Sequence, residues 1–155
     1  MAVAQPNDYS EQTLVCIQNC QDCHRACLQT LAYCLRQGGR HAEGDHLRLL
    51  MDCADICLTS AAFMIRGSDL HAHTCAACAE VCRRCAEEYD HMSDDLRMKA
   101  LADTCRHCAE SCRSMAAGHA GGTGDGVAKV GRGATRAIRQ AGATAAPVMT
   151  RRKTK

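Results

Sequence analysis

Apolar residues recur every three or four positions along most of the chain, and helix-breaking residues interrupt that rhythm at four places. The breaks are QGGRHAEG (37–44), Gly67-Ser68, His91-Met92-Ser93, and Gly118 followed by GGTGDG. Gly67 suits the position after a helix, and Ser68 and Ser93 suit N-caps. Four segments of several turns each remain, and short connections between long helices favour antiparallel neighbours. The pattern predicts an all-α fold, an antiparallel up-down-up-down four-helix bundle.

Each segment carries one stripe of positions spaced alternately three and four apart. Such a stripe is the seam that a helix presents to its neighbours in a bundle. All 14 cysteines of the chain fall on the four stripes. A cysteine-lined core is therefore predicted, formed by Cys16, Cys20, Cys23, Cys27, Cys34, Cys53, Cys57, Cys75, Cys78, Cys82, Cys85, Cys105, Cys108 and Cys112.

Charge separates the predicted bundle from the C-terminal part of the chain. Residues 1–117 hold 11 Lys and Arg against 16 Asp and Glu, a formal −5, whereas residues 118–155 hold 8 against 1, a formal +7. We expect an N-terminal segment at 1–9, the bundle at 10–118, and a flexible, disordered basic tail rich in Gly and Ala at 119–155. A basic tail favours an acidic partner, which the sequence does not identify.

Cysteines four apart on a helix place their Cβ atoms about 5 to 6 Å apart, so two thiolates can flank one ion. The seams hold Cys, Met and His without carboxylates, a soft ligand set that selects Cu(I). Many Cu(I) ions could then stack along the bundle. A metallothionein-like Zn(II) or Cd(II) buffer, an iron–sulfur protein and a thiol redox protein stay open as alternatives, as do a purely structural core and interhelical disulfides.

The sequence also bears on compartment and on catalysis. No signal-peptide pattern precedes the first stripe, and no apolar run is long enough to cross a membrane. We therefore expect a protein of the cytoplasm, where thiols stay reduced. No carboxylate pair, phosphate-binding loop or nucleophile motif appears, and 14 similar thiols single out no nucleophile. An enzyme is not expected.

The runs CIQNCQDCHRAC, CADIC, CAACAEVCRRC and CRHCAESC together resemble the bacterial copper storage proteins, over roughly residues 10–118. That resemblance implies many Cu(I) ions per subunit, thiolate coordination inside the bundle, a homotetramer, and a role in copper storage or detoxification. The chain is similar to the cytosolic branch of the family. Which copper chaperone, if any, delivers the ions stays open.

Residues at the two ends of the bundle suggest where copper enters. One end gathers Met64, His71, Met115 and His119, which are weak and exchangeable ligands, and is the predicted entrance. The other gathers His46 with Leu50, Tyr89 and Leu101, which could plug it. Core filler is the alternative for the two methionines, and an ordinary helix-end histidine is the alternative for His46 and His71.

Additional apolar residues lie off the thiol seam, mainly in the first two helices. They predict that these two helices form a subunit interface. The alternative is that these residues pack against each other within one bundle.

Overall fold

The computed structural model describes residues 9–92 and 94–118. These residues form four α-helices and one 3-10 turn, and no strand occurs among them: α1 (Glu11–Gln37), η1 (Gly39–Ala42), α2 (Gly44–Ile65), α3 (His71–Asp90) and α4 (Leu96–Gly118). The all-α prediction is confirmed. The predicted tail at 119–155 lies outside the described residues.

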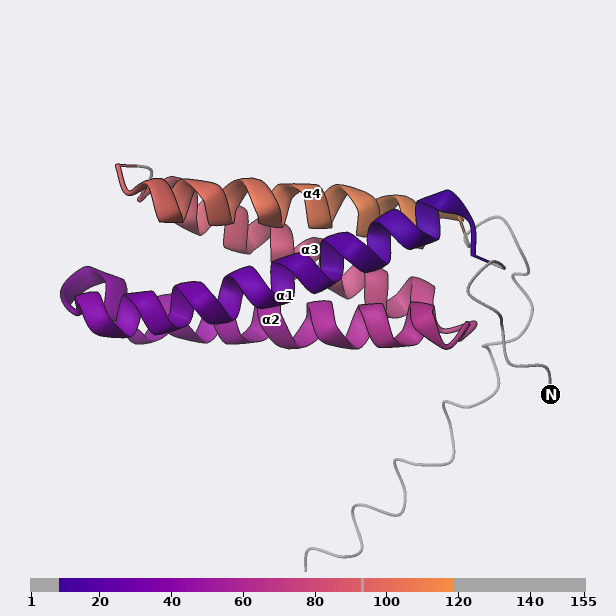
Figure 1. The fold of residues 1–155 in the computed structure, drawn as a ribbon, viewed down its shortest axis with the longest axis horizontal. Coiled ribbons are helices and arrows are strands. Elements are labelled where there is room, and N and C mark those ends of the chain that lie inside the picture. Colours follow the sequence, from indigo (N-terminus) through magenta and orange to yellow (C-terminus); the bar gives the residue numbers. More distant parts are fainter. Residues whose placement is uncertain (1–8, 93, 119–155) are drawn as a thin grey trace, which may run out of the picture. The chain divides into compact units, whose positions relative to one another are not determined.

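Each helix packs against two others in a closed ring. Helix α1 lies against α2 and α4, and α3 lies against α2 and α4 (Figure 1). Sulfur contacts give the direction of the chains. Between α2 and α3, Cys53 meets Cys82 whereas Cys57 meets Cys78, and sequence order therefore runs in opposite directions. The same holds between α1 and α4, where Cys16 meets Cys112 whereas Cys23 meets Cys105. This is the up-down-up-down bundle that the spacing predicts.

The helix ends agree only in part with the predicted caps. Ser10 caps α1, because its side chain accepts a hydrogen bond from the Thr13 amide at 3.1 Å. Gly67 adopts φ 63°, the left-handed backbone that suits the residue after a helix. The expectation for Ser68 is wrong, since α3 begins only at His71, behind Leu70, and Ser68 accepts a hydrogen bond from the Leu70 amide instead. Ser93 lies outside the described residues.

The core consists mainly of small side chains. All 14 cysteines have no exposed surface, as the stripes predict. A second buried row of alanines follows the seam on the last three helices, each one residue after a seam position: Ala54, Ala61, Ala79, Ala86, Ala102 and Ala109. Small residues in this row let the helices approach closely, which brings thiols on different helices within contact distance.

One end of the bundle is closed by larger side chains. Leu50, Tyr89, Met98 and Leu101 are at most 2% exposed. The Tyr89 hydroxyl donates to the His46 carbonyl oxygen at 3.0 Å, which satisfies the polar atom of an otherwise apolar plug. Solvent is thus excluded from the thiols at this end.

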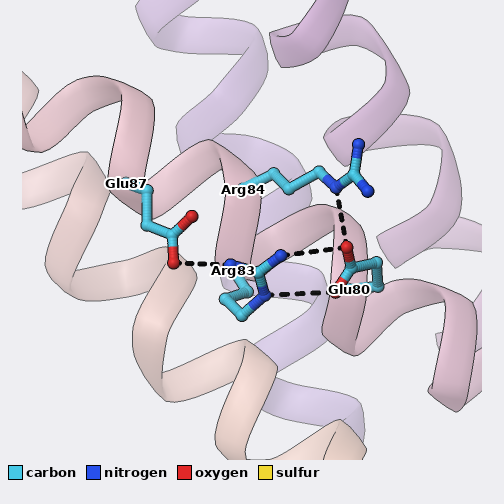
Figure 2. Close-up of polar contacts among 4 residues, drawn as sticks. All are labelled: Glu80, Arg83, Arg84 and Glu87. Atoms are coloured by element: carbon cyan, nitrogen blue, oxygen red, sulfur yellow. Dashed lines mark hydrogen bonds and ion pairs between the residues drawn. The ribbon is translucent and has the colours of Figure 1, made fainter.

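The outer faces of the helices differ in character. On α3, Glu80 accepts hydrogen bonds from Arg83 and Arg84, and Arg83 also pairs with Glu87 (Figure 2). The two guanidinium groups, Arg83 above all, lower the pKa of Glu80 to about 2. On α1 and α2 the outer faces also carry exposed apolar residues such as Leu35 and Leu58, each more than half exposed, beside ion pairs such as Arg25–Asp22. Exposed apolar residues are thus concentrated on α1 and α2.

Candidate metal centre

The thiols of all four helices meet along the interior of the bundle. Contacting sulfur atoms on different residues lie 3.4 to 4.0 Å apart. The shortest contacts join Cys20 to Cys112 and Cys57 to Cys82, both at 3.4 Å. A disulfide needs about 2.05 Å between the sulfurs. The cysteines are therefore free thiols, in van der Waals contact and available to a metal.

Twelve of the 14 thiols fall into five groups whose sulfur atoms all lie within 4.8 Å of one another. The groups share members, so that they form one continuous thiol column rather than separate sites. They are Cys16/Cys75/Cys112, Cys20/Cys78/Cys108/Cys112, Cys57/Cys78/Cys82/Cys108, Cys23/Cys53/Cys57/Cys82 and Cys23/Cys27/Cys53/Cys105.

The two remaining cysteines differ from each other. Cys85 borders the column, because hydrogen bonds with Cys105 and Cys27 act on its thiol. Cys34 stands apart, near the plugged end. Burial, followed by the negative charge of Asp95, raises the pKa of the Cys34 thiol. The structure thus brings 12 of the 14 predicted ligands into the groups, places Cys85 beside them and leaves Cys34 outside.

The chemistry of the column favours a soft metal ion. Its donors are sulfurs, and the only buried polar side chains among the described residues belong to Thr30 and Ser60. Sulfur spacings of this size also suit tetrahedral zinc, with its Zn–S bonds of about 2.3 Å. The number of sulfurs that each ion needs distinguishes the two metals: a zinc site takes four thiolates, whereas Cu(I) accepts few ligands at a time, so the same thiols can hold more Cu(I) than Zn(II).

Neighbouring thiols control one another's protonation. A hydrogen bond with Cys112 is the main contact that lowers the pKa of the Cys16 thiol. The pKa of Cys112 is raised in turn, first by its contact with Cys108 and then by its contact with Cys16. An S–H group that donates to a neighbouring sulfur stabilises the thiolate there and retains its own proton. Thiolates are the metal-binding form, so uptake of a cation in place of these shared protons is favoured.

A pocket of about 350 Å³ lies at the end opposite the plug. Met64, His71 and Met115 line it together, along with polar residues that include Ser68, Asp69 and Ser114. Met64 is 2% exposed, and the Cys75 thiol donates to its sulfur at 3.9 Å. The pKa of Cys75 is raised to about 12: its contact with Cys112 lowers it, but its contact with Cys16 and burial outweigh that effect. We call this cavity the end pocket; it leads through Met64 to the first thiol group.

Of the two other predicted auxiliary residues, only His46 is among the described residues. His46 is at the plugged end, where its Nδ1 is 2.9 Å from a Glu88 carboxylate oxygen and its Nε2 is 3.7 Å from Glu43. Its two ring nitrogens thus face carboxylates. His119 lies outside the described residues. Sequence reasoning missed Ser68 and Asp69 as pocket residues, although their place in the short turn between α2 and α3 already puts them at this end.

Comparison with known proteins gives a consistent result. The family model described as copper storage protein matches residues 9–117. A Bacillus subtilis protein described as uncharacterized cysteine-rich protein YhjQ is 38% identical over 109 residues, which cover 70% of this chain and 97% of that protein. The Cu(I)-bound copper storage protein BsCsp3 has a similar structure, with a TM-score of 0.64, 36% identity, and coverage of 68% of this chain and 99% of that chain. A cytosolic copper storage protein from Streptomyces lividans, with five coppers, gives a TM-score of 0.60 at 29% identity and covers 69% of this chain and 93% of that one.

The grouping of the thiols predicts unequal effects of single substitutions. Cys57 belongs to two groups and Cys34 to none. Cys57→Ala should lower the Cu(I) capacity of the reduced protein by roughly two ions, whereas Cys34→Ala should lower it by about one ion or less. Capacity is measured by anaerobic titration, with circular dichroism to confirm that both variants keep the helix content. Equal losses from the two variants would contradict the grouping.

Proposed function

The chain belongs to the copper storage protein family, and we propose that its buried cysteines hold many Cu(I) ions as thiolates inside one bundle. The observation that carries the proposal is the thiol column: sulfurs from four helices in overlapping groups, in a core without a carboxylate. Shared thiols can bridge successive ions, so that one column holds more metal than separate closed sites could. The proposed ligands are the column thiols with Cys85, and Cys34 as a peripheral member.

Storage rather than catalysis fits the same observation. A catalytic thiol is one activated sulfur in a cleft that a substrate can reach. Here every thiol is fully buried, and its neighbours are other thiols. The related protein from Streptomyces lividans is described as cytosolic, which supports the same compartment for this chain. None of the helices in the described part of the chain is long and apolar enough to cross a membrane.

A Zn(II) buffer is the alternative that the sulfur spacing allows. The two metals differ in the number of thiolates that each ion takes. Zinc takes about four thiolates per ion, whereas Cu(I) is satisfied by about two and accepts bridging sulfurs.

We expect the fully reduced protein to bind about one Cu(I) per thiol or more, with helix content unchanged and with copper held against a strong Cu(I) chelator. The measurement is an anaerobic titration, with Zn(II) titrated in parallel. Saturation near one ion per four thiols, with zinc preferred over copper, would instead identify a zinc buffer.

We propose that copper enters through the end pocket. Met64, His71 and Met115 offer thioether and imidazole ligands, which bind Cu(I) more weakly than thiolates and release it more readily. Met64 contacts Cys75, a member of the first thiol group, so that an ion can pass from thioether to thiolate by exchanging one ligand at a time. At the opposite end, by contrast, Leu50, Tyr89, Met98 and Leu101 fill the interior of the bundle.

Replacement of both pocket thioethers by leucine should slow loading severalfold without changing capacity, because leucine keeps the shape and removes the ligand. The measurement is the stopped-flow rate of copper transfer from a Cu(I) chelate to Met64→Leu/Met115→Leu. Met51→Leu is the matched control, since Met51 lies on the outer face of α2 and is 51% exposed. Unchanged loading in the double variant would rule out the thioether route.

We also propose that the chain forms a homo-oligomer, a tetramer by family resemblance, through the outer faces of α1 and α2. Among the described residues, seven of the nine exposed large apolar side chains lie on these two helices. Their exposure, 43% or more in each case, argues against packing within one bundle. Five of the seven follow a seven-residue spacing, which is the repeat of a helix–helix seam. These are Leu28 and Leu35 on α1, and Met51, Leu58 and Ile65 on α2.

Leu58→Glu should therefore dissociate the oligomer, because a carboxylate at the centre of an apolar seam loses its water without gaining a partner. The control is Leu96→Glu on α4, where the side chain is 81% exposed and belongs to no such seam. Sedimentation velocity reports the mass of each variant. If Leu58→Glu sediments as the wild type does, the interface lies elsewhere.

A further inference from the structure

The side chain of Ser60 differs from most other hydroxyl groups on the described helices. It has no exposed surface, and its oxygen has no hydrogen-bond partner among the described residues. Thr59, Thr104 and Ser114 each donate instead to the backbone carbonyl four residues earlier, at 2.9, 2.9 and 3.2 Å. That local bond is the usual choice for a hydroxyl inside a helix. A buried hydroxyl without a partner costs free energy, so Ser60 calls for a reason.

The position of Ser60 on the thiol seam suggests that reason. Ser60 lies between Cys57 and Met64 on the core stripe of α2. Cys57 contacts Cys78 at 3.7 Å, and Met64 contacts Cys75 at 3.9 Å, so Ser60 lies level with the turn of α3 that joins these two cysteines. At this level Cys75 forms a three-thiol group with Cys16 of α1 and Cys112 of α4. We call this group the outer trio; α2 contributes a hydroxyl to its level instead of a fourth thiol.

We propose that Ser60 donates a hydrogen bond to a thiolate of the outer trio when that trio holds Cu(I). This inference rests on the proposed storage function and assigns a role to a residue that is not itself a ligand. A protonated thiol is a weak acceptor, whereas a thiolate is anionic and accepts strongly. The donor of Ser60 therefore finds its strongest acceptor in the loaded state, where copper replaces the protons of the trio. The hydroxyl oxygen is a hard donor, so Cu(I) is not expected to bind it directly.

The outer trio is the first thiol group below the end pocket, because Cys75 contacts the pocket residue Met64. Copper held there is the copper closest to exchange with solution. A hydrogen bond to its thiolate reduces the excess negative charge in a site of low dielectric constant and so favours the loaded form. Ser60 is thereby a positioning residue that sets how firmly the outermost stored copper is held.

The test compares Ser60→Ala with Thr59→Ala, its exposed neighbour on the same helix. Both full-length variants are loaded with Cu(I) and challenged with a strong Cu(I) chelator. We expect the most labile copper of Ser60→Ala to be held about tenfold more weakly than in the wild type, the effect of losing one hydrogen bond to a charged group. Thr59→Ala should match the wild type. In denaturant unfolding, apo Ser60→Ala should be as stable as the wild type or more so, because it buries no unpaired hydroxyl.

Ser60→Cys tests the location independently. A thiol at this level completes a four-thiol group with Cys16, Cys75 and Cys112, so capacity should rise by about one ion and release to the chelator should slow. If Ser60 merely filled space, Ser60→Ala and Ser60→Cys would not change copper retention in opposite directions while the stability of the apo protein is preserved.

The outcomes separate this inference from the function on which it rests. If the wild type itself fails to retain Cu(I), the storage function is wrong. If the wild type retains copper but Ser60→Ala behaves as Thr59→Ala does, the hydrogen bond is absent and the inference alone fails. Unchanged capacity and release in Ser60→Cys would likewise overturn it, because Ser60 would then not face the trio.

Discussion

The close approach of the helices is the constraint on which the rest of this structure depends. Thiols on different helices touch at 3.4 to 4.0 Å, and on α2, α3 and α4 the residues beside the seam are small, above all the alanine row at Ala54, Ala79 and Ala109. Leucine or isoleucine in this row would hold these three helices further apart and separate their thiols. The same choice reduces the apolar area that folding buries, because Cys and Ala contribute less than Leu. The residues that are used to bind metal therefore contribute less to hydrophobic stabilisation of the fold.

The bundle compensates for that loss at its ends and on its outer faces. Leu50, Tyr89 and Met98 supply the bulk that the middle of the core lacks, and they fill that end of the bundle. The other end has an open pocket instead. In the proposed oligomer, the exposed apolar residues of α1 and α2 would add burial beyond what one bundle can provide. Larger side chains at one end thus complement a core of small thiols along the axis.

Much of this arrangement could be predicted from the spacing of residues. The alternating three- and four-residue repeat specified the helices, their antiparallel order and the burial of every cysteine. Cys34 shows the limit: it follows the repeat, yet it stands apart from the thiol groups, because the registers of the neighbouring helices at that level place larger side chains there. Ser68 is not the N-cap of α3, because the turn after Gly67 continues through Leu70 before α3 begins at His71. Such details depend on the packing of neighbouring helices and turns, which the residue pattern of a single helix does not specify.

The sharing of thiols among groups limits which metal ions the column can hold efficiently. Each of Cys23, Cys57 and Cys78 belongs to two of the groups, so no more than two of the four-thiol groups can be occupied at once by ions that need all their ligands to themselves. A metal of that kind would leave several buried thiols unused in a core that gives up hydrophobic burial to hold them. A metal satisfied by two or three thiolates, and tolerant of sulfurs that bridge two ions, uses the whole column. The overlap of the groups, more than the number of cysteines, is therefore the feature that favours Cu(I) over Zn(II).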